Sequence, residues 1–176
     1  MAPKVSLKYL SVNDYEKFQE ALNDDWESHF EFVHYWNTLV NRDFETYIKM
    51  APDFSKGKWI PKEHVPCTFL FAFNEEKEVV GRVSFRHELN DHLLKVGGHI
   101  GYGVCPKKRR RGYATSILRE SLNYVKLNFP KINKVLVTCS EGNIGSVKTI
   151  ERNGGILENS IEISDGTKKL RYWISL

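Results

Sequence analysis

Residues 98–118 read GHIGYGVCPKKRRRGYATSIL, and three sequence patterns meet in this stretch. GHIGYGV (98–104) alternates apolar residues with glycines, which is typical of a strand whose backbone another group approaches closely. Five consecutive basic residues follow at 107–111. Beyond Gly112, apolar residues recur on one face of a helix of about four turns. The stretch therefore predicts a strand, a basic loop and an amphipathic helix in succession.

The junction of the basic loop and the helix suits a compact phosphate group. Gly112 and Ala114 are small, so a ligand can approach the backbone closely there. The first N–H groups of a helix have no partner inside it and carry the positive end of its dipole. Arginines beside them add charge-assisted hydrogen bonds. We therefore expect a diphosphate-sized anion to bind at this junction.

Composition excludes several other classes of protein. The chain has 176 residues, with 41% hydrophobic and 27% charged residues, as in a single soluble globular domain. Its 26 Lys and Arg exceed its 22 Asp and Glu only because of the basic loop, whereas nucleic-acid-binding proteins usually spread positive charge over a face. We therefore expect no nucleic acid as partner. No membrane span, secretory leader or metal-ligand spacing is evident, which predicts a cytoplasmic protein without a metal.

The remaining sequence predicts alternating helices and strands. Apolar spacing predicts a helix over 11–23, with Asn13 and Glu16 as a capping pair, and a second helical segment through Trp26, Phe30, Val33 and Val40. A short helix over 44–50, a hairpin of 68–73 with 79–85, a buried strand over 134–139, a helix over 144–153 and two final strands at 161–163 and 170–176 complete the prediction. This order predicts a mixed α/β sheet with helices on its faces.

Two motifs resemble those of the GNAT superfamily, the acyl-CoA-dependent N-acyltransferases. Arg109-x-x-Gly112-x-Ala114 matches the R/Q-x-x-G-x-G/A signature, between a strand and a helix as that family requires. NIGSVKTIERNGG (143–155) resembles the second motif, with Asn143 and Ser146 on its main positions. The resemblance covers roughly residues 68–176.

The resemblance implies an α/β (α+β) fold in one domain, residues 1–176. Its sheet would be mixed and mostly antiparallel, with about six to seven strands, splayed at the cofactor site and covered by helices on both faces. Residues 1–66 would form a helical segment on the acceptor side, and residues 67–176 the sheet and the acyl-CoA-binding core.

The resemblance also implies acetyl-CoA as co-substrate. The backbone near Val104 would pair with the pantetheine arm, and the amides of 109–114 would hold the diphosphate. Lys107, Lys108 or Arg110 would reach the 3′-phosphate of CoA. The implied cofactor-binding residues are Val104, Lys107, Arg109, Arg110, Arg111, Gly112, Tyr113, Ala114, Thr115, Asn143 and Ser146.

The catalytic residues follow less directly from the motifs. Many family members use a tyrosine as general acid where this chain has Ile150. Tyr102, Tyr113 and Tyr172 are alternative acids, among which the sequence does not choose. His99 is a candidate base because an imidazole has a pKa near ~6.5, and Glu141 competes with it. A hydrogen-bonded histidine that lines the sheet is the simpler interpretation of His99.

These residues predict an N-acetyltransferase that moves the acetyl group of acetyl-CoA to a primary amine of a small molecule or protein. A CoA-binding sensor without catalysis is one alternative, and a nucleic-acid-binding protein that uses the KKRRR loop is another. A homodimer is also compatible with the sequence.

Overall fold

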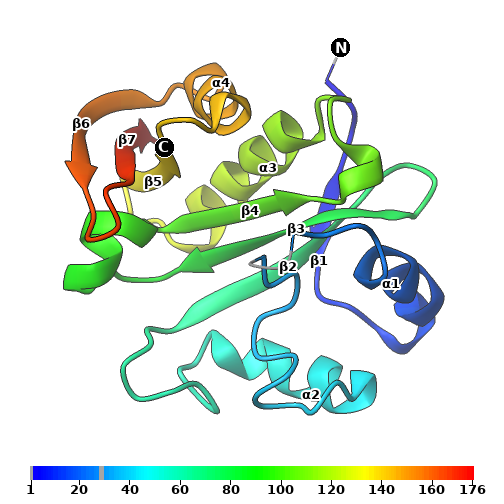
Figure 1. Cartoon of the computed structure of the whole chain (residues 1–176). Helices are drawn as coiled ribbons and strands as arrows, with labels where there is room; N and C mark the ends of the chain where they lie inside the picture. The colour runs from blue at the N-terminus through cyan, green and yellow to red at the C-terminus, as the bar shows by residue number, and fades with distance from the viewer. Residues whose placement is uncertain (1, 28–29) are drawn as a thin grey trace.

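The computed structural model describes residues 2–27 and 30–176. In this part of the chain, seven strands form two sheets, with the orders β1-β2-β3-β4 and β5-β7-β6 (Figure 1). All the strand pairs within these sheets are antiparallel. The strands are β1 (Ser6–Lys8), β2 (Cys67–Phe73), β3 (Val79–Arg86), β4 (Ile100–Val104), β5 (Lys134–Ser140), β6 (Ile156–Glu162) and β7 (Lys168–Ser175).

Helices cover both faces of the first sheet, as expected from the sequence. The α-helices are α1 (Tyr15–Leu22), α2 (Phe44–Phe54), α3 (Tyr113–Asn128) and α4 (Ile144–Arg152). Figure 1 shows α1 and α2 on one side of the sheet and α3 on the other. Short 3₁₀ turns span Val12–Asp14 and Pro106–Lys108, and a π-helical turn spans Leu93–Gly97. None of the helices in the described residues is both long and apolar enough to cross a membrane.

Strand β2 contributes to both hydrophobic cores because its side chains alternate between the two faces. Phe69, Phe71 and Phe73 pack in the cluster that contains α1 and α2. Leu70 and Ala72 pack in the cluster that contains α3 and the second sheet. All seven residues of β2 are buried, which explains why its sequence is almost wholly apolar.

The predicted second helix is wrong for the residues that the structure describes. Residues 30–42 form a series of turns, while residues 28 and 29 of that prediction lie outside the described residues. Tyr35, Asn41 and Arg42 have φ values of 62°, 46° and 61°, and this left-handed conformation is incompatible with a continuing right-handed helix. Val33 and Val40 are nevertheless buried, so the apolar spacing recorded their burial rather than a helix.

Other differences concern the ends of elements. Ser11 and Asp14, rather than Asn13 and Glu16, form the capping box at the start of the first helical segment. Helix α2 continues to Phe54, past the end expected at 50. Strand β1 was not predicted from the sequence. Strand β6 begins at 156 rather than near 161, because most of the β6 residues are exposed and show no apolar alternation.

In the described part of the chain, hydrogen bonds join the two sheets at one pair of residues, His99 and Leu136, while side chains of both sheets share one hydrophobic cluster. The His99 N–H donates to the Leu136 carbonyl over 2.7 Å, and the Leu136 N–H donates to His99 Nδ1 over 2.9 Å. Beyond this junction, no strand pairing joins β4 to β5 among the described residues. The edge of β4 that faces β5 is therefore open, as expected for a splayed sheet.

Candidate functional site

Strand β4 presents different groups on its two faces. Ile100, Tyr102 and Val104 point toward α3 and pack in its hydrophobic cluster. Gly101 and Gly103 occupy the alternate positions, so the face toward α1 and α2 has no side chains of its own. The Phe30 ring covers Gly103 on that face, so a ligand there would meet the backbone of β4 at Gly101.

The open edge of β4 offers hydrogen-bonding groups at Val104. The Cys105 N–H donates to the Val80 carbonyl of β3 over 2.9 Å. Because successive N–H groups of a strand point to opposite edges, the Val104 N–H points away from β3, toward the gap between the sheets. The Val104 carbonyl accepts a bond of 3.2 Å from Arg109 Nε. An extended ligand in the gap can therefore pair with Val104 as an added strand would.

Three residues of the basic loop are paired with carboxylates distant in sequence. Lys107 lies 3.6 Å from Asp24 through Nζ, and its N–H donates to the same carboxylate over 3.1 Å. Lys108 Nζ lies 2.6 Å from Glu78. The two terminal nitrogens of the Arg109 guanidinium bind the two oxygens of Glu27, one of them over 2.8 Å. These carboxylates neutralise much of the local charge.

Arg110 and Arg111 differ from these three residues. Both are exposed, and neither has a hydrogen bond or ion pair from its side chain within the part of the chain that the structure describes. Both lie immediately before Gly112, at the start of α3. The loop therefore has two cations available for a ligand, next to the helix N-terminus.

The backbone at the start of α3 has free N–H groups where the sequence pattern predicts an anion site. Among the described residues, no hydrogen-bond acceptor meets the six consecutive N–H groups of residues 110–115. Arg110 and Gly112 have φ values of 63° and 86°, and turns of this kind direct successive N–H groups toward a common centre. With the helix dipole, this arrangement suits a diphosphate.

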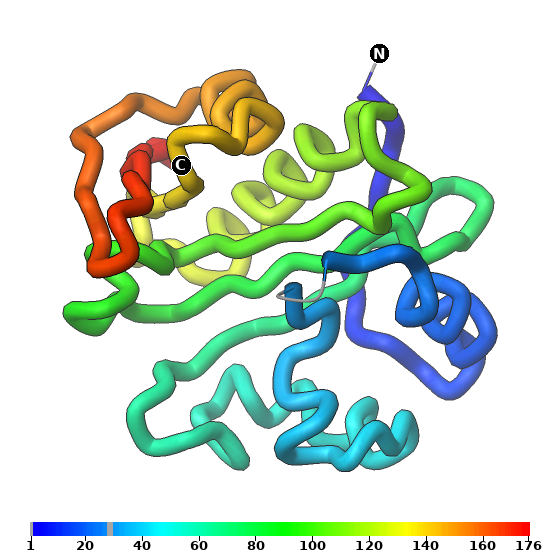
Figure 2. Tube along the Cα trace, viewed as in Figure 1, coloured from blue at the N-terminus to red at the C-terminus, as the bar shows by residue number. Residues whose placement is uncertain are grey.

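The N-terminal segment borders this site. Ser116 Oγ donates to the Pro3 carbonyl over 2.6 Å, and a Cβ at Gly112 would lie 3.0 Å from Pro3 Cδ. Figure 2 shows the first residues of the chain running beside the loop that precedes α3. Two features therefore favour glycine at position 112: its positive φ, and the close approach of the N-terminal segment.

Asn143, Ser146 and Tyr102 come together across the gap from the anion site. Asn143 caps α4, and its Oδ1 accepts the Ser146 N–H over 3.0 Å. The Tyr102 hydroxyl donates to Ser146 Oγ over 3.2 Å. Burial raises the pKa of Tyr102 to about 12, which keeps the phenol protonated near neutral pH. Ile150, at the position where relatives often have a tyrosine, is fully buried in the core.

His99 and Glu141 occupy different surroundings. His99 is 8% exposed, and its Nδ1 already accepts the Leu136 N–H. Burial, with a smaller effect from the Arg86 charge, lowers the pKa of His99 to about 4, so the ring is neutral at pH 7. Glu141 lies in the exposed turn after β5. No contact joins Glu141 to His99 or Tyr102 in the described residues, so the structure does not bring these candidates together.

Two arginines of β3 lie beside the glycine face of β4. Arg82 is 7% exposed, and its guanidinium lies 4.6 Å from the ring centre of Phe30. Arg86 Nη1 lies 3.5 Å from the position of a Cβ on Gly101. The sequence motifs did not point to Arg82, and Arg86 stood out only as the start of the polar run 86–92. The signal was the alternation R-V-S-F-R (82–86), which places polar residues on one face of an otherwise buried strand.

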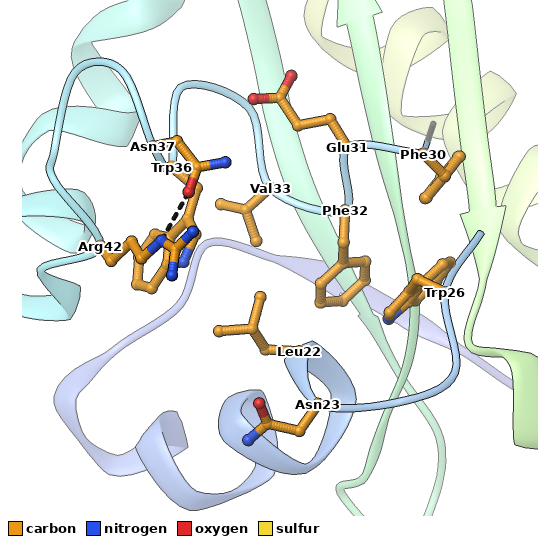
Figure 3. A pocket seen from close by; sticks show the side chains of 10 residues that line it. All are labelled: Leu22, Asn23, Trp26, Phe30, Glu31, Phe32, Val33, Trp36, Asn37 and Arg42. Carbon is orange, nitrogen blue, oxygen red and sulfur yellow. Dashed lines mark hydrogen bonds between the residues drawn. The ribbon is translucent and has the colours of Figure 1, made fainter. Parts of the chain in front are cut away.

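An aromatic pocket of about 310 Å³ lies beside this face, between the end of α1 and residues 30–42 (Figure 3). The Trp26 ring stacks between those of Phe30 and Phe32, at centroid distances of 4.9 and 4.5 Å. Figure 3 shows the Glu31 carboxylate pointing away from the pocket. The lining residues are Leu22, Asn23, Trp26, Phe30, Glu31, Phe32, Val33, Trp36, Asn37 and Arg42.

In the described residues, no group of three or more His, Cys, Asp or Glu side chains could hold a metal ion. A different kind of ligand matches the open edge of β4 and the start of α3. It would be extended where it meets β4 and would carry phosphates where it meets α3. Acyl-CoA has this form.

Comparison with known proteins identifies the family. The family model described as Acetyltransferase (GNAT) domain matches residues 4–156, and the chain belongs to this family. One curated relative is the uncharacterized N-acetyltransferase YjdG of Bacillus subtilis (strain 168), with 22% identity over 107 residues. That match covers 61% of this chain and spans 58% of the relative's length.

Solved structures share the fold at low sequence identity. A chimera of the spermidine N-acetyltransferase SpeG from Vibrio cholerae and hSSAT superimposes with a TM-score of 0.61, at 16% identity, covering 97% of this chain and 95% of the other. The Microcin C7 self immunity acetyltransferase MccE, solved in complex with acetyl-CoA and AMP, gives a TM-score of 0.61 at 20% identity, covering 98% and 93%. The two-sheet fold with helices on both faces is thus that of GNAT acetyltransferases.

Proposed function

We propose that this protein transfers the acetyl group of acetyl-CoA to a primary amine. One observation carries the proposal: six consecutive backbone N–H groups without an acceptor in the described residues lie beside two unpaired arginines and near the open edge of β4. Membership of the GNAT family supports it. The acceptor approaches from the glycine face of β4 at Gly101, beside Arg86 and the Phe30 ring that covers Gly103.

Each part of acetyl-CoA has a matching part of the site. The N–H groups of residues 110–115 hold the diphosphate, and Arg110 and Arg111 supply the free charge nearest to it. Val104 pairs with the pantetheine amides. Asn143 and Ser146 border the pantetheine arm from the opposite side of the gap. To bind the 3′-phosphate, Lys107 would have to leave its ion pair with Asp24, and Lys108 its ion pair with Glu78.

Acetyl-CoA supplies a thioester, whose carbonyl carbon the neutral amine attacks. A new C–N bond forms, the C–S bond breaks, and the proton of the amine passes to solvent. A backbone N–H near Val104 stabilises the developing oxyanion. Holding amine and thioester in line supplies much of the rate increase.

Tyr102 is the general acid in this proposal. Its raised pKa keeps a proton on the hydroxyl, and it lies on β4 against the capped end of α4. The departing thiolate takes this proton. His99, neutral and bonded through Nδ1, positions β4 against β5 instead of acting as the base.

Calorimetric titration with CoA and a thiol-release assay together test the proposal. CoA should bind to the wild-type protein and not to Gly112→Glu, whose carboxylate would repel the diphosphate. Thiol release from acetyl-CoA should then depend on an added amine. The three cysteines Cys67, Cys105 and Cys139 are buried, and burial raises the pKa of each thiol, so the folded protein adds little to the thiol signal.

Two outcomes would contradict the proposal. CoA binding without thiol release across a broad amine panel would indicate a CoA sensor, which the buried Ile150 at the family's tyrosine position would fit. Absence of CoA binding, with binding to DNA or RNA that weakens steeply with salt, would indicate a nucleic-acid-binding protein. The pairing of Lys107, Lys108 and Arg109 with carboxylates argues against this second outcome.

A further inference from the structure

The guanidinium of Arg86 lies over the bare face of β4. Its Nη1 and Nη2 atoms lie 3.5 and 3.7 Å from the position that a Cβ on Gly101 would occupy. In the described residues, its only side-chain hydrogen bonds are long ones from Nη1 to the carbonyls of Gly97 and Gly98, over 3.4 and 3.3 Å. Nε and Nη2 make no hydrogen bond in the described residues, yet neither is sealed from solvent. Arg86 therefore keeps donors available on the acceptor side of β4.

The charge of Arg86 has no carboxylate partner within the part of the chain that the structure describes. The same is true of Arg82, four residues earlier on the same face of β3. Arg82 is 7% exposed, and its Nε is buried without a hydrogen-bond partner. Two positive charges removed from water without an anion are unfavourable, and an anion bound nearby would offset that cost.

Neighbouring groups report the same positive field. Burial, with further effects from Arg82 and Arg86, lowers the pKa of His34 to about 3. The Glu31 side chain, on the nearest described segment, is exposed and points away from the aromatic pocket. Arg82 donates to the Glu31 backbone carbonyl over 2.9 Å, and the Glu31 charge raises the pKa of Arg82 less than burial and Arg86 lower it. A polycation would therefore meet like charge on this face, whereas an anion would meet two arginines.

The geometry along β4 sets the distance between this charge and the transfer point. Gly101 and Val104 are three positions apart, which corresponds to roughly 10 Å along a strand. An acceptor whose amine reaches the thioester near Val104 can thus place a second group over Gly101. We propose that the acceptor carries an anionic group, a carboxylate or a phosphate, that binds Arg86 over Gly101. This proposal rests on the proposed acetyl transfer.

Binding to the CoA complex tests the anionic subsite without requiring turnover. The probes are 6-aminohexanoate, its uncharged amide 6-aminohexanamide, 4-aminobutyl phosphate and spermidine, each titrated into protein saturated with CoA. We expect at least one of the two anionic amines to bind about tenfold or more tightly than the amide. Their order distinguishes carboxylate from phosphate recognition. Equal affinity of the amide and both anions, or tighter binding of spermidine, would overturn the proposal.

Arg86 variants separate charge recognition from support of the fold. Arg86→Gln should abolish the preference for the anionic probe, while Arg86→Lys should keep most of it, and CoA affinity should stay nearly constant in both. Arg119→Gln, on the exposed side of α3 beside Glu120, removes a matched charge elsewhere and should leave the preference unchanged. A preference that persists in Arg86→Gln would overturn the assignment to Arg86.

The same probes in the thiol-release assay distinguish the two proposals. If the anionic amines bind selectively but no probe is acetylated, the acetyl transfer fails and the anionic subsite stands. If amines are acetylated without regard to their anionic group, the transfer stands and the subsite fails. In the case that both hold, Arg86→Gln should raise KM for the anionic acceptor about tenfold or more with little change in kcat.

Discussion

His99 and Leu136 exchange two hydrogen bonds and form the only backbone junction between β4 and β5 in the described residues. The junction requires a neutral imidazole with an acceptor at Nδ1. Protonation of Nδ1 would remove that acceptor and place a charge in a buried site near Arg86. Stability should therefore depend on the protonation state of His99.

We expect the free energy of unfolding to fall as the pH drops below about 6.5. The pKa of His99 is lowered to about 4 in the folded chain, so between these values the unfolded chain binds more protons, which favours unfolding. His99 should contribute a loss of about 2 kcal/mol between pH 7 and pH 5. Urea unfolding at the two pH values measures the loss.

His99→Gln is the control for this prediction, because its side-chain oxygen can still accept the Leu136 N–H and does not titrate. Its stability should vary less with pH than that of the wild type. The pH profile of kcat should keep its shape in this variant between pH 6 and 8 if His99 is not the base. An unchanged stability slope, or a lost ionisation in the kcat profile, would contradict the positioning role.

Tyr102→Phe should lower kcat by about a hundredfold, because it removes the proton offered to the thiolate. KM for acetyl-CoA should change little, since the ring remains in place. Ser146→Ala removes the acceptor of the Tyr102 hydroxyl without removing the acid, so its loss should be smaller. Steady-state kinetics measure both variants, and a Tyr102→Phe enzyme as fast as wild type would mean that the thiolate leaves unaided.

Arg110→Gln and Arg111→Gln should each weaken CoA binding by about tenfold, because each removes an unpaired charge beside the diphosphate site. Lys107→Gln should have a much smaller effect, since Asp24 already neutralises Lys107. Calorimetric titration with CoA and with dephospho-CoA measures these losses and locates the 3′-phosphate contact. A Lys107→Gln loss as large as that of the arginine variants would show that Asp24 yields to the ligand.

Gly81→Ala should lower the stability of the fold, whereas Gly101→Ala should weaken binding of the acceptor. A Cβ at Gly81 would lie 2.3 Å from the Gly103 carbonyl oxygen, so Gly81→Ala should destabilise the fold by about 1–3 kcal/mol. A Cβ at Gly101 meets Ser84 Oγ at 3.2 Å, a mild contact, so the melting temperature should change little. Gly101→Ala should instead raise KM for the acceptor with nearly unchanged CoA affinity. A large fall in melting temperature for Gly101→Ala would contradict this contrast.

The sequence allowed most of the central elements to be predicted because their patterns are local. The hairpin of β2 and β3, strand β5 and helices α3 and α4 all show clear apolar periods, and the glycines of β4 indicated a strand in close contact with another group. The segment 30–42 could not be predicted in this way. Its apolar residues are buried by tertiary contacts with α1, α2 and β2, while its left-handed residues carry no glycine signal.

The site shows the same division. The turn before α3, with its free N–H groups, is formed by adjacent residues, so the motif was sufficient to predict where it lies. The partners of the basic loop were not predictable, because Asp24 and Glu27 lie more than 80 positions away and meet the loop only in the folded chain. The environment of His99 likewise depends on Leu136 of a different sheet. Charge and protonation at the site are therefore tertiary properties.

The glycines of β4 also bear on how the acceptor preference of this protein can change. Gly101 and Gly103 leave the acceptor face to side chains from other segments, such as Phe30 and Arg86. The backbone that would hold the thioester and the residues that would choose the amine thus belong to different parts of the sequence. Under the proposed acetyl transfer, substitutions at positions 30 and 86 would change which amines are accepted, in evolution or by engineering, and would leave the backbone of β4 unchanged.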